Sequence, residues 1–374
     1  MIPYGKQTIE DDDIAAVVAV LRGDWLTQGP HVAAFEETLA EAADAPYAVA
    51  FSSGTAALHA ACHAAGLGSS DEVLTSALTF AASANCAAYV GATPAFADID
   101  PETWNVSAET IGAALTARTR AVIPVSFAGL PAPLAEIRET VGPDVTIIED
   151  AAHALGGHRS DGRVGAALHA DMSVFSFHPV KTVATGEGGA ITLRDPELRE
   201  RLLSFRSHGM TKNPGRLERP DEGGWYMEQQ DLGFNYRITD FQCALGISQM
   251  AKLERFVAAR NAIAERYRAA LADVEGLRLP PAAPSGSRHA YHLFVVAVRE
   301  RRALYDALRE RGILAQVHDL PVYLHPWYRE TYGHAPGLCP EAEAYYESCL
   351  SLPCFPSLTE ADQDTVIAAV RALV

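Results

Sequence analysis

Lysine is scarce in this chain of 374 residues. Among its 30 lysines and arginines only four are lysines, namely Lys6, Lys181, Lys212 and Lys252. Lysine can lose its proton and form an imine with an aldehyde, whereas arginine does neither. Lys181 follows an apolar, strand-like segment and precedes a glycine-rich turn, and no acidic residue lies near it in the sequence. Lys181 is therefore a candidate covalent catalyst.

The chain also lacks an excess of positive charge and any long apolar run. Its formal net charge is -17, which argues against broad binding of nucleic acid because no basic face can be assembled easily. The amino terminus has no apolar signal core, and no apolar run is long enough to cross a membrane. These absences predict a cytoplasmic protein that binds neither nucleic acid nor membranes.

The cysteines show no pattern of a metal site or a redox pair. None forms a Cys-x-x-Cys pair, and the spacings do not match those of zinc ligands. We therefore expect no metal and six free, buried thiols, as suits a reducing compartment. The six are Cys62, Cys86, Cys243, Cys339, Cys349 and Cys354.

The first two thirds of the chain alternate short apolar runs with helical patterns. This alternation predicts an α/β fold with a mostly parallel sheet, whose sites lie at the carboxyl ends of the strands. Helices are expected over Thr55–Ala65 and Phe80–Val90. Strands are expected over Tyr47–Ser52, Glu72–Ser76, Pro94–Asp98, Ala121–Ser126, Val145–Glu149, Met172–Phe177 and Ala190–Leu193.

The pattern changes near Asp240, which predicts a second, smaller α+β domain. We place the large domain at residues 10–245 and the small domain at residues 246–374, together with residues 1–9. The acidic run Asp11–Asp13 indicates the start of a helix. In and before the second domain, helices are expected over Ile238–Tyr267, Arg301–Arg311, Glu341–Cys349 and Glu360–Leu373, and strands over His289–Val298 and Ile313–Val317.

Asp150 and His153 follow the apolar strand pattern that ends at Glu149. A carboxylate at the end of such a strand projects toward the crevice where α/β sheets bind ligands. Taken alone, Asp150 fits an N-cap of the next helix equally well, and His153 fits a hydrogen-bonded structural histidine. Both become functional candidates only when partners are present.

Two further segments are candidates for ligand contact. Ser53, Gly54 and Thr55 stand between a strand and a helix, where backbone amides and hydroxyls can hold a phosphate. Ordinary helix capping explains the same residues. Phe80 follows the next strand, where it either stacks on a flat ring or belongs to the core.

Taken together, these segments fit the chemistry of pyridoxal 5′-phosphate. Such an enzyme needs a lysine that holds the aldehyde and moves protons, which Lys181 would supply. A carboxylate, here Asp150, pairs with the protonated ring nitrogen so that the ring can take up electrons. The phosphate site would lie at residues 53–55, and Phe80 would cover the ring.

The motifs at residues 53–58, 149–153, 176–181, 187–189 and 233–240 occur in an order that resembles the DegT/DnrJ/EryC1/StrS sugar aminotransferases. The resemblance implies a fold-type I, aspartate aminotransferase-like enzyme that uses pyridoxal phosphate. Residues 3–9, 26–29, 205–210 and 311–318 resemble one branch of this family, the UDP-4-amino-4,6-dideoxy-N-acetyl-β-L-altrosamine transaminases of pseudaminic acid synthesis.

The resemblance also implies a role for each matching residue. Lys181, Asp150 and His153 would be catalytic, with His153 at the ring's phenolic oxygen. Asn235 would reach the phosphate of a neighbouring subunit, which implies a homodimer with a shared site. The other cofactor-binding residues would be Ser53, Gly54, Thr55, Phe80 and Ser176, and the sugar site would include Tyr4, Lys6, Leu26, Thr27, Gln28, Gly29, His318 and Asp319.

One residue departs from the family pattern. Many members have His-Tyr-x-Pro where this chain has His318, Asp319, Leu320 and Pro321. A carboxylate beside a diphosphate sugar is unfavourable unless it faces a hydroxyl, an amine or solvent. The contact made by Asp319 is therefore open at this stage.

The reaction implied by the resemblance transfers an amino group from L-glutamate, which leaves as 2-oxoglutarate. The acceptor would be carbon C4 of a UDP-linked 4-keto-6-deoxy-N-acetylhexosamine. Alternatives are a sister aminotransferase that uses another keto sugar, of the perosamine, bacillosamine or C3-amino type, and a pyridoxal phosphate-binding regulator without turnover.

Overall fold

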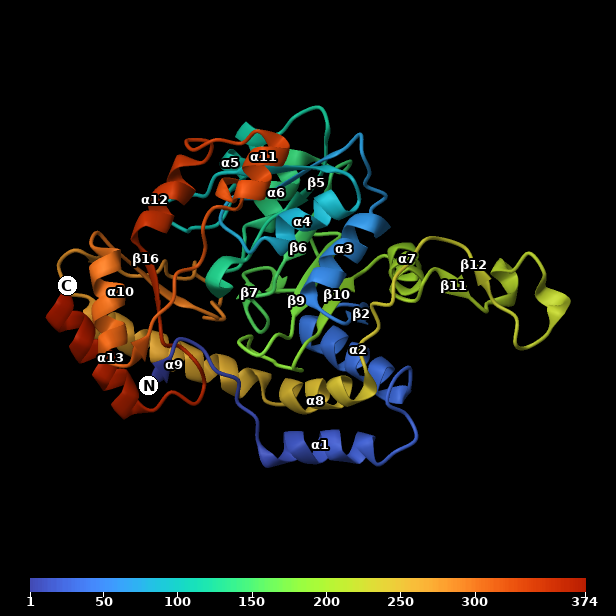
Figure 1. Cartoon of the computed structure of the whole chain (residues 1–374), viewed down its shortest axis with the longest axis horizontal. Helices are drawn as coiled ribbons and strands as arrows, with labels where there is room; N and C mark the ends of the chain where they lie inside the picture. Colours follow the sequence, from blue (N-terminus) through green and yellow to red (C-terminus); the bar gives the residue numbers. More distant parts are fainter.

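The centre of the molecule is a seven-stranded sheet with the strand order β2-β10-β9-β6-β5-β3-β4. The computed structural model describes all residues from 1 to 374 and is shown in Figure 1. Only β10 runs antiparallel to its neighbours, so the predicted α/β fold with a mostly parallel sheet is confirmed. The strands are β2 (Tyr47–Phe51), β3 (Glu72–Ser76), β4 (Thr93–Ala97), β5 (Thr119–Ile123), β6 (Thr146–Asp150), β9 (Met172–Ser176) and β10 (Gly189–Leu193).

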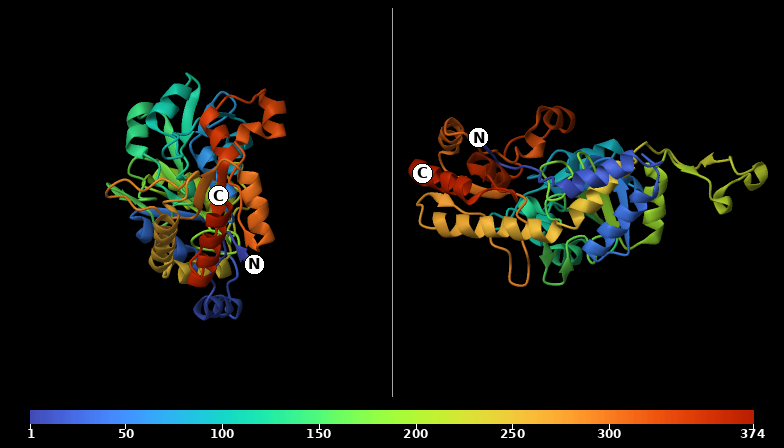
Figure 2. Two further views of the ribbon diagram at one scale, coloured as in Figure 1. Left: turned by 90° about the vertical axis from the view of Figure 1, so that its left-hand side faces the viewer. Right: turned by 90° about the horizontal axis from the view of Figure 1, so that it is seen from below.

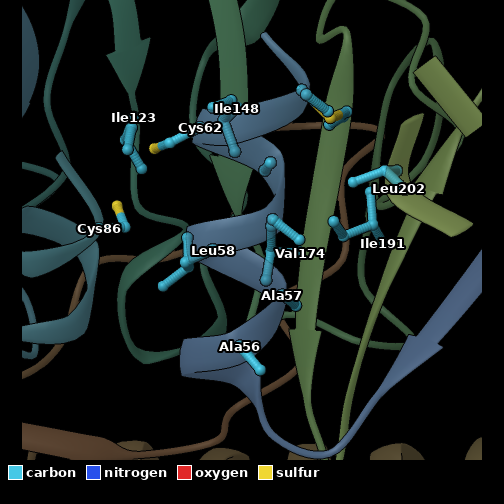
Figure 3. Close-up of a cluster of buried hydrophobic side chains, with 14 of the residues drawn as sticks. Ala56, Ala57, Leu58, Cys62, Cys86, Ile123, Ile148, Val174, Ile191 and Leu202 are labelled. Carbon is cyan, nitrogen blue, oxygen red and sulfur yellow. The ribbon is translucent and has the colours of Figure 1, made fainter. Parts of the chain in front are cut away.

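Helices cover the sheet, which explains why its strands are apolar on both faces. On helix α3 (Gly54–Ala64), Ala56 and Ala57 are small enough for the helix to approach the sheet closely. Leu58 of α3 and Val174 of β9 belong to the same buried apolar cluster (Figure 3). The other helices of this region are α2 (Pro30–Ala43), α4 (Ala82–Tyr89), α5 (Ala108–Ala114), α6 (Leu134–Val141) and α7 (Pro196–Arg206).

The prediction of a single helix over Ile238–Tyr267 is wrong, because the structure has two helices in this region. Helix α8 (Asp240–Met250) ends before Lys252, and α9 (Leu253–Leu271) follows after this short break (Figure 1). The Lys252 ammonium lies 2.7 Å from carboxylate oxygens of both Asp12 and Asp13 in α1 (Asp11–Leu21). These long-range ion pairs fix the break, and no helix-breaking residue marks it in the sequence.

The carboxyl-terminal part has its own small antiparallel sheet, β13-β14-β16, with a separate apolar core. The expected strand over His289–Val298 is shorter than predicted, since only Phe294–Val298 pairs as β14. Residues 289–293 are irregular and turn toward the large sheet. The other elements are β13 (Leu277–Arg278), α10 (Arg301–Glu310), β15 (Ile313–Leu314), α11 (Pro326–Tyr332), α12 (Pro340–Ser348), β16 (Cys349–Leu352) and α13 (Glu360–Leu373).

The chain's first residues lie with its last third. Strand β1 (Ile2–Pro3) pairs in parallel with β15, which places Tyr4 beside the segment that follows β15. The division at residue 245 stays a prediction. The two parts of the chain pack against each other, since one apolar cluster contains residues from both, such as Phe96 and Tyr323.

A narrow arm formed by residues 209–231 projects from the body of the molecule (Figures 1 and 2). Strands β11 (Met210–Thr211) and β12 (Glu228–Gln229) form its base. Trp225 in this arm is 77% exposed. A second short hairpin consists of β7 (His158–Arg159) and β8 (Gly162–Arg163).

All six cysteines are free and buried, as predicted. No helix combines the length and the apolar character that a membrane span requires.

Arg260 of α9 joins two other backbone segments, residues 291–292 and Cys354, in the interior. Its side chain is 1% exposed, and its guanidinium donates hydrogen bonds to the carbonyl oxygens of Tyr291 (3.2 Å), His292 (3.1 Å) and Cys354 (2.6 Å). We expect Arg260→Leu to lower the free energy of unfolding by about 3–5 kcal/mol, because it leaves these buried carbonyls unpaired. Denaturant unfolding measures this loss, and Arg302→Leu on the exposed face of α10 serves as the control. Equal free energies of unfolding for the two variants would contradict the stabilising role of Arg260.

Candidate active site

A cavity of about 580 Å³ opens where β2, β6 and β9 end. It gathers residues that lie far apart in the sequence, because the carboxyl ends of parallel strands meet at one edge of the sheet. Of the residues predicted from the sequence, those that line it are Tyr4, Ser53, Gly54, Thr55, Phe80, Asp150, His153, Ser176, Lys181, His318 and Asp319.

Lys181 lies in the loop that joins β9 to the antiparallel strand β10. The loop is closed by two hydrogen bonds of 2.9 Å, since Phe177 donates its amide to Gly188 and accepts from the amide of Thr185. Burial lowers the pKa of Lys181 to about 8, although the carboxylates of Asp150 and Asp319 oppose this shift. At pH 7 roughly one lysine in ten is then a neutral amine, which is the reactive form.

We expect this lowered pKa to be visible in chemical labelling of the enzyme after removal of its cofactor. Acylation of Lys181 should rise with pH to a midpoint near 8 and then level off, whereas an ordinary lysine gains reactivity up to about pH 10.4. Peptide mass spectrometry resolves the four lysines, and Lys212 in the arm is an exposed internal reference. A midpoint of Lys181 above 10 would contradict the prediction.

Asp150 ends β6 and is buried, with two hydrogen bonds from the protein. The Ser83 hydroxyl donates to it over 2.5 Å, and the Ala152 amide donates over 3.1 Å. Burial raises the pKa of Asp150, and both hydrogen bonds oppose that shift by stabilising the carboxylate. The Asp150 carboxylate is thus held in place beside the cavity, where it can accept a hydrogen bond from a positively charged N–H group.

The neighbouring Glu149 anchors the same strand from the opposite side. It is fully buried and accepts hydrogen bonds from Ser126 (2.7 Å) and Ser173 (2.9 Å), and Arg159 also contacts it. Sequence reasoning missed these partners because three different segments supply them. Their effect is to fix the end of β6, and with it the position of Asp150.

His153 is held between a backbone amide and a second histidine. Its Nδ1 accepts a hydrogen bond of 3.3 Å from Ala128, and the ring of His292 packs over it at 4.3 Å between centroids. Burial keeps the pKa of His153 well below its usual value, and the nearby Lys181 adds to this effect. His153 is therefore neutral, with Nε2 as its remaining proton donor. No motif in the sequence pointed to His292.

The amino terminus of α3 forms an anion-binding turn. Ser53 caps the amide of Ala56 at 3.1 Å, while the amides of Gly54 and Thr55 make no hydrogen bond within the chain. A Cβ atom at Gly54 would lie only 3.0 Å from the Cβ of Ser176, so glycine keeps this turn open to a ligand. Free amides at a helix amino terminus are suited to a phosphate.

Phe80 stands at the cavity with 67% of its surface exposed. The interpretation of Phe80 as a core residue is therefore wrong. Its exposed ring is free to cover a flat ligand.

Lys6, Asn235 and residues 26–29 do not line the cavity of their own chain. Gly29 donates its amide to Asp240 at the start of α8 over 2.8 Å. Asn235 pairs with Ser207. Long-range contacts of this kind hold these segments on the surface outside the cavity.

Comparisons with known proteins agree with this geometry. The model of the DegT/DnrJ/EryC1/StrS aminotransferase family matches residues 7–371. The chain belongs to this family. The spore coat polysaccharide biosynthesis protein SpsC of Bacillus subtilis is 38% identical, and the match covers 100% of this chain and 97% of SpsC.

Solved structures of aminotransferases share the whole fold. The match to Helicobacter pylori PseC, an aminotransferase involved in the biosynthesis of pseudoaminic acid, has a TM-score of 0.91 at 29% identity and covers 100% of this chain and 98% of PseC. The match to the PLP form of Spr1654, a putative sugar aminotransferase from Streptococcus pneumoniae, has a TM-score of 0.91 at 26% identity and covers 100% and 98%.

The resemblance to the DegT/DnrJ/EryC1/StrS family is thereby confirmed, as are the fold type and the cofactor. This member of the family is an enzyme, an aminotransferase that depends on pyridoxal 5′-phosphate. The cavity fits that cofactor chemically, because it offers an amine for the aldehyde, a carboxylate for the ring nitrogen and free amides for the phosphate. The role of each residue remains a proposal.

Proposed function

We propose that this aminotransferase transfers the amino group of L-glutamate to C4 of a UDP-linked 4-keto-6-deoxy-N-acetylhexosamine, giving UDP-4-amino-4,6-dideoxy-N-acetyl-β-L-altrosamine. The observation that carries the proposal is the cavity that joins Lys181, Asp150 and the free amides of α3. The full-length likeness to PseC supports the choice of sugar.

The proposal assigns a role to each part of the cavity. Bound pyridoxal phosphate withdraws electrons from the carbon that carries the transferred amino group. Lys181, with its lowered pKa, would act as the base and acid that moves a proton between the substrate carbon and the cofactor carbon. Asp150 keeps the ring nitrogen protonated, and Ser83 holds that carboxylate in place. His153 donates from Nε2, and residues 53–55 with Ser176 bind the phosphate.

The choice of acceptor is tested with a panel of UDP- and dTDP-linked keto sugars. Purified enzyme is given L-glutamate and each sugar, and the aminated product is identified by mass spectrometry and NMR. We expect the UDP-linked 4-keto-6-deoxy-N-acetylhexosamine of the altrosamine series to react fastest. Faster amination of a perosamine-, bacillosamine- or C3-type precursor would replace the proposed substrate, and no turnover of any sugar would contradict the proposal.

We further propose that the active unit is a homodimer in which Asn235, Lys6 and residues 26–29 complete the partner's cavity. The support is their location outside the cavity of their own chain, next to exposed apolar side chains. These side chains are Trp25, Leu26, Leu232 and Phe234.

Mixing two inactive variants tests this arrangement. A dimer of one Lys181→Ala chain and one Asn235→Ala chain has one site that lacks both residues and one intact site. Refolded or co-expressed mixtures should therefore regain about a quarter of wild-type activity if chains pair at random, since about half of the dimers are mixed. Activity no higher than the average of the separate variants would contradict a shared site.

A further inference from the structure

Asp319 is a charged residue of the cavity to which no role has yet been assigned. It lines the cavity together with Lys181 and Tyr4, yet no donor group of the protein forms a hydrogen bond to its carboxylate. The only favourable charge that acts on it comes from Lys181. Asp319 is half-buried, and its carboxylate faces the cavity without a donor from the protein. A ligand that fills the cavity displaces the water there and must supply a donor in its place, because carboxylates removed from water are normally hydrogen-bonded.

The backbone around Asp319 is held firmly, so its position is not that of a loose loop. His318 Nδ1 pairs with the Ser351 hydroxyl at 2.8 Å, and the Tyr345 hydroxyl donates to the carbonyl of His318 at 2.9 Å. Gln316 and Ser351 exchange two backbone hydrogen bonds, of 3.2 and 2.7 Å. The segment that carries Asp319 is therefore fixed to β16 before any ligand binds.

Burial raises the pKa of Asp319 to about 6, and the positive charge of Lys181 opposes this shift. At pH 7 most of Asp319 is ionised. A donor from a bound ligand would stabilise this charge more than a donor in water, because the ligand displaces solvent from the half-buried carboxylate.

The identity of the donor follows from the chemistry of the proposed substrate, on which this inference rests. Lys181 must reach the reacting carbon, and Asp319 is close enough to Lys181 for their charges to shift each other's pKa. On a 4-keto-6-deoxy sugar the carbon on one side of C4 bears no donor, because position 6 is a methyl group. The carbon on the other side, C3, bears a hydroxyl.

We propose that Asp319 is a specificity-determining residue that accepts a hydrogen bond from the sugar hydroxyl adjacent to the reacting keto carbon. The residue distinguishes keto sugars that have this hydroxyl from those that lack it. It also disfavours anionic groups at this position, so the diphosphate of the substrate lies away from it.

Asp319→Asn tests the proposal, because the amide has the same shape and lacks the charge. The two half-reactions are followed separately in single turnovers by the absorption of the bound cofactor, first with L-glutamate and then with the keto sugar. We expect kcat/KM of the sugar half-reaction to fall by at least about tenfold more than that of the glutamate half-reaction. Asp306→Asn, on the exposed face of α10, is the control.

A substrate analogue with hydrogen in place of the C3 hydroxyl completes the cycle. For the wild-type enzyme, kcat/KM of the sugar half-reaction should fall with this analogue by about the same factor as Asp319→Asn lowers it with the full sugar. For the Asp319→Asn variant, replacing the full sugar by the analogue should lower kcat/KM little further. Additive losses would overturn the proposal. An equal fall in both half-reactions would also overturn it, because Asp319 would then act through Lys181.

The failure of this inference differs from failure of the proposed function. If the wild-type enzyme aminates the sugar and Asp319→Asn does so with the same kcat/KM, only the proposed role of Asp319 is refuted. If the wild-type enzyme aminates no keto sugar, both the proposed function and the proposed role of Asp319 are refuted.

Discussion

Lys181→Ala should reduce turnover by at least about four orders of magnitude, because it removes both the covalent attachment of the cofactor and the group that moves the proton. No other lysine can replace it. Lys6 does not line the cavity, Lys212 lies in the arm, and Lys252 is held by Asp12 and Asp13. Steady-state assays with L-glutamate and the keto sugar measure this loss.

The fold should survive this substitution, since Lys181 makes no ion pair or side-chain hydrogen bond in the structure. Thermal unfolding of Lys181→Ala should therefore match that of the wild-type enzyme freed of cofactor. Lys212→Ala is the matched control and should retain full activity. Full activity of Lys181→Ala would remove the residue from the mechanism.

Asp150→Asn should slow both half-reactions by about two to three orders of magnitude, a range typical of the loss of one electrostatic contact at a reacting centre. The amide keeps the shape of the side chain but cannot hold a proton on the ring nitrogen through its charge. Single-turnover kinetics measure both steps.

The structure provides controls for this second variant. Asp195→Asn changes an exposed carboxylate that caps α7 and should leave turnover unchanged. Asp150→Glu restores the charge and should recover part of the rate. Unchanged rates in Asp150→Asn would show that the carboxylate serves only to cap the turn after β6.

The sequence was sufficient to predict the site where chemistry depends on residue type. Only a lysine can supply the amine, and apolar runs mark the strands that carry Asp150 and Ser176. Each taken alone was ambiguous, and the ambiguity of Phe80 was resolved only by its exposure in the structure.

What the sequence could not predict depends on contacts between distant segments. His292 reaches His153 because β14 begins later than its apolar pattern suggests. The break before α9 follows from ion pairs to residues about 240 positions away. Asp319 stands out in the sequence as a departure from the family, but its lack of a hydrogen-bond donor is visible only in the folded cavity.

We propose that Lys181 and Asp150 form an aminotransferase site for glutamate and a keto sugar. The visible absorption of the purified enzyme tests it most directly. We expect a yellow enzyme that L-glutamate bleaches, with release of 2-oxoglutarate, and whose colour returns when the keto sugar is added. A yellow enzyme that glutamate does not bleach, or a bleached one that no keto sugar restores, would contradict the account.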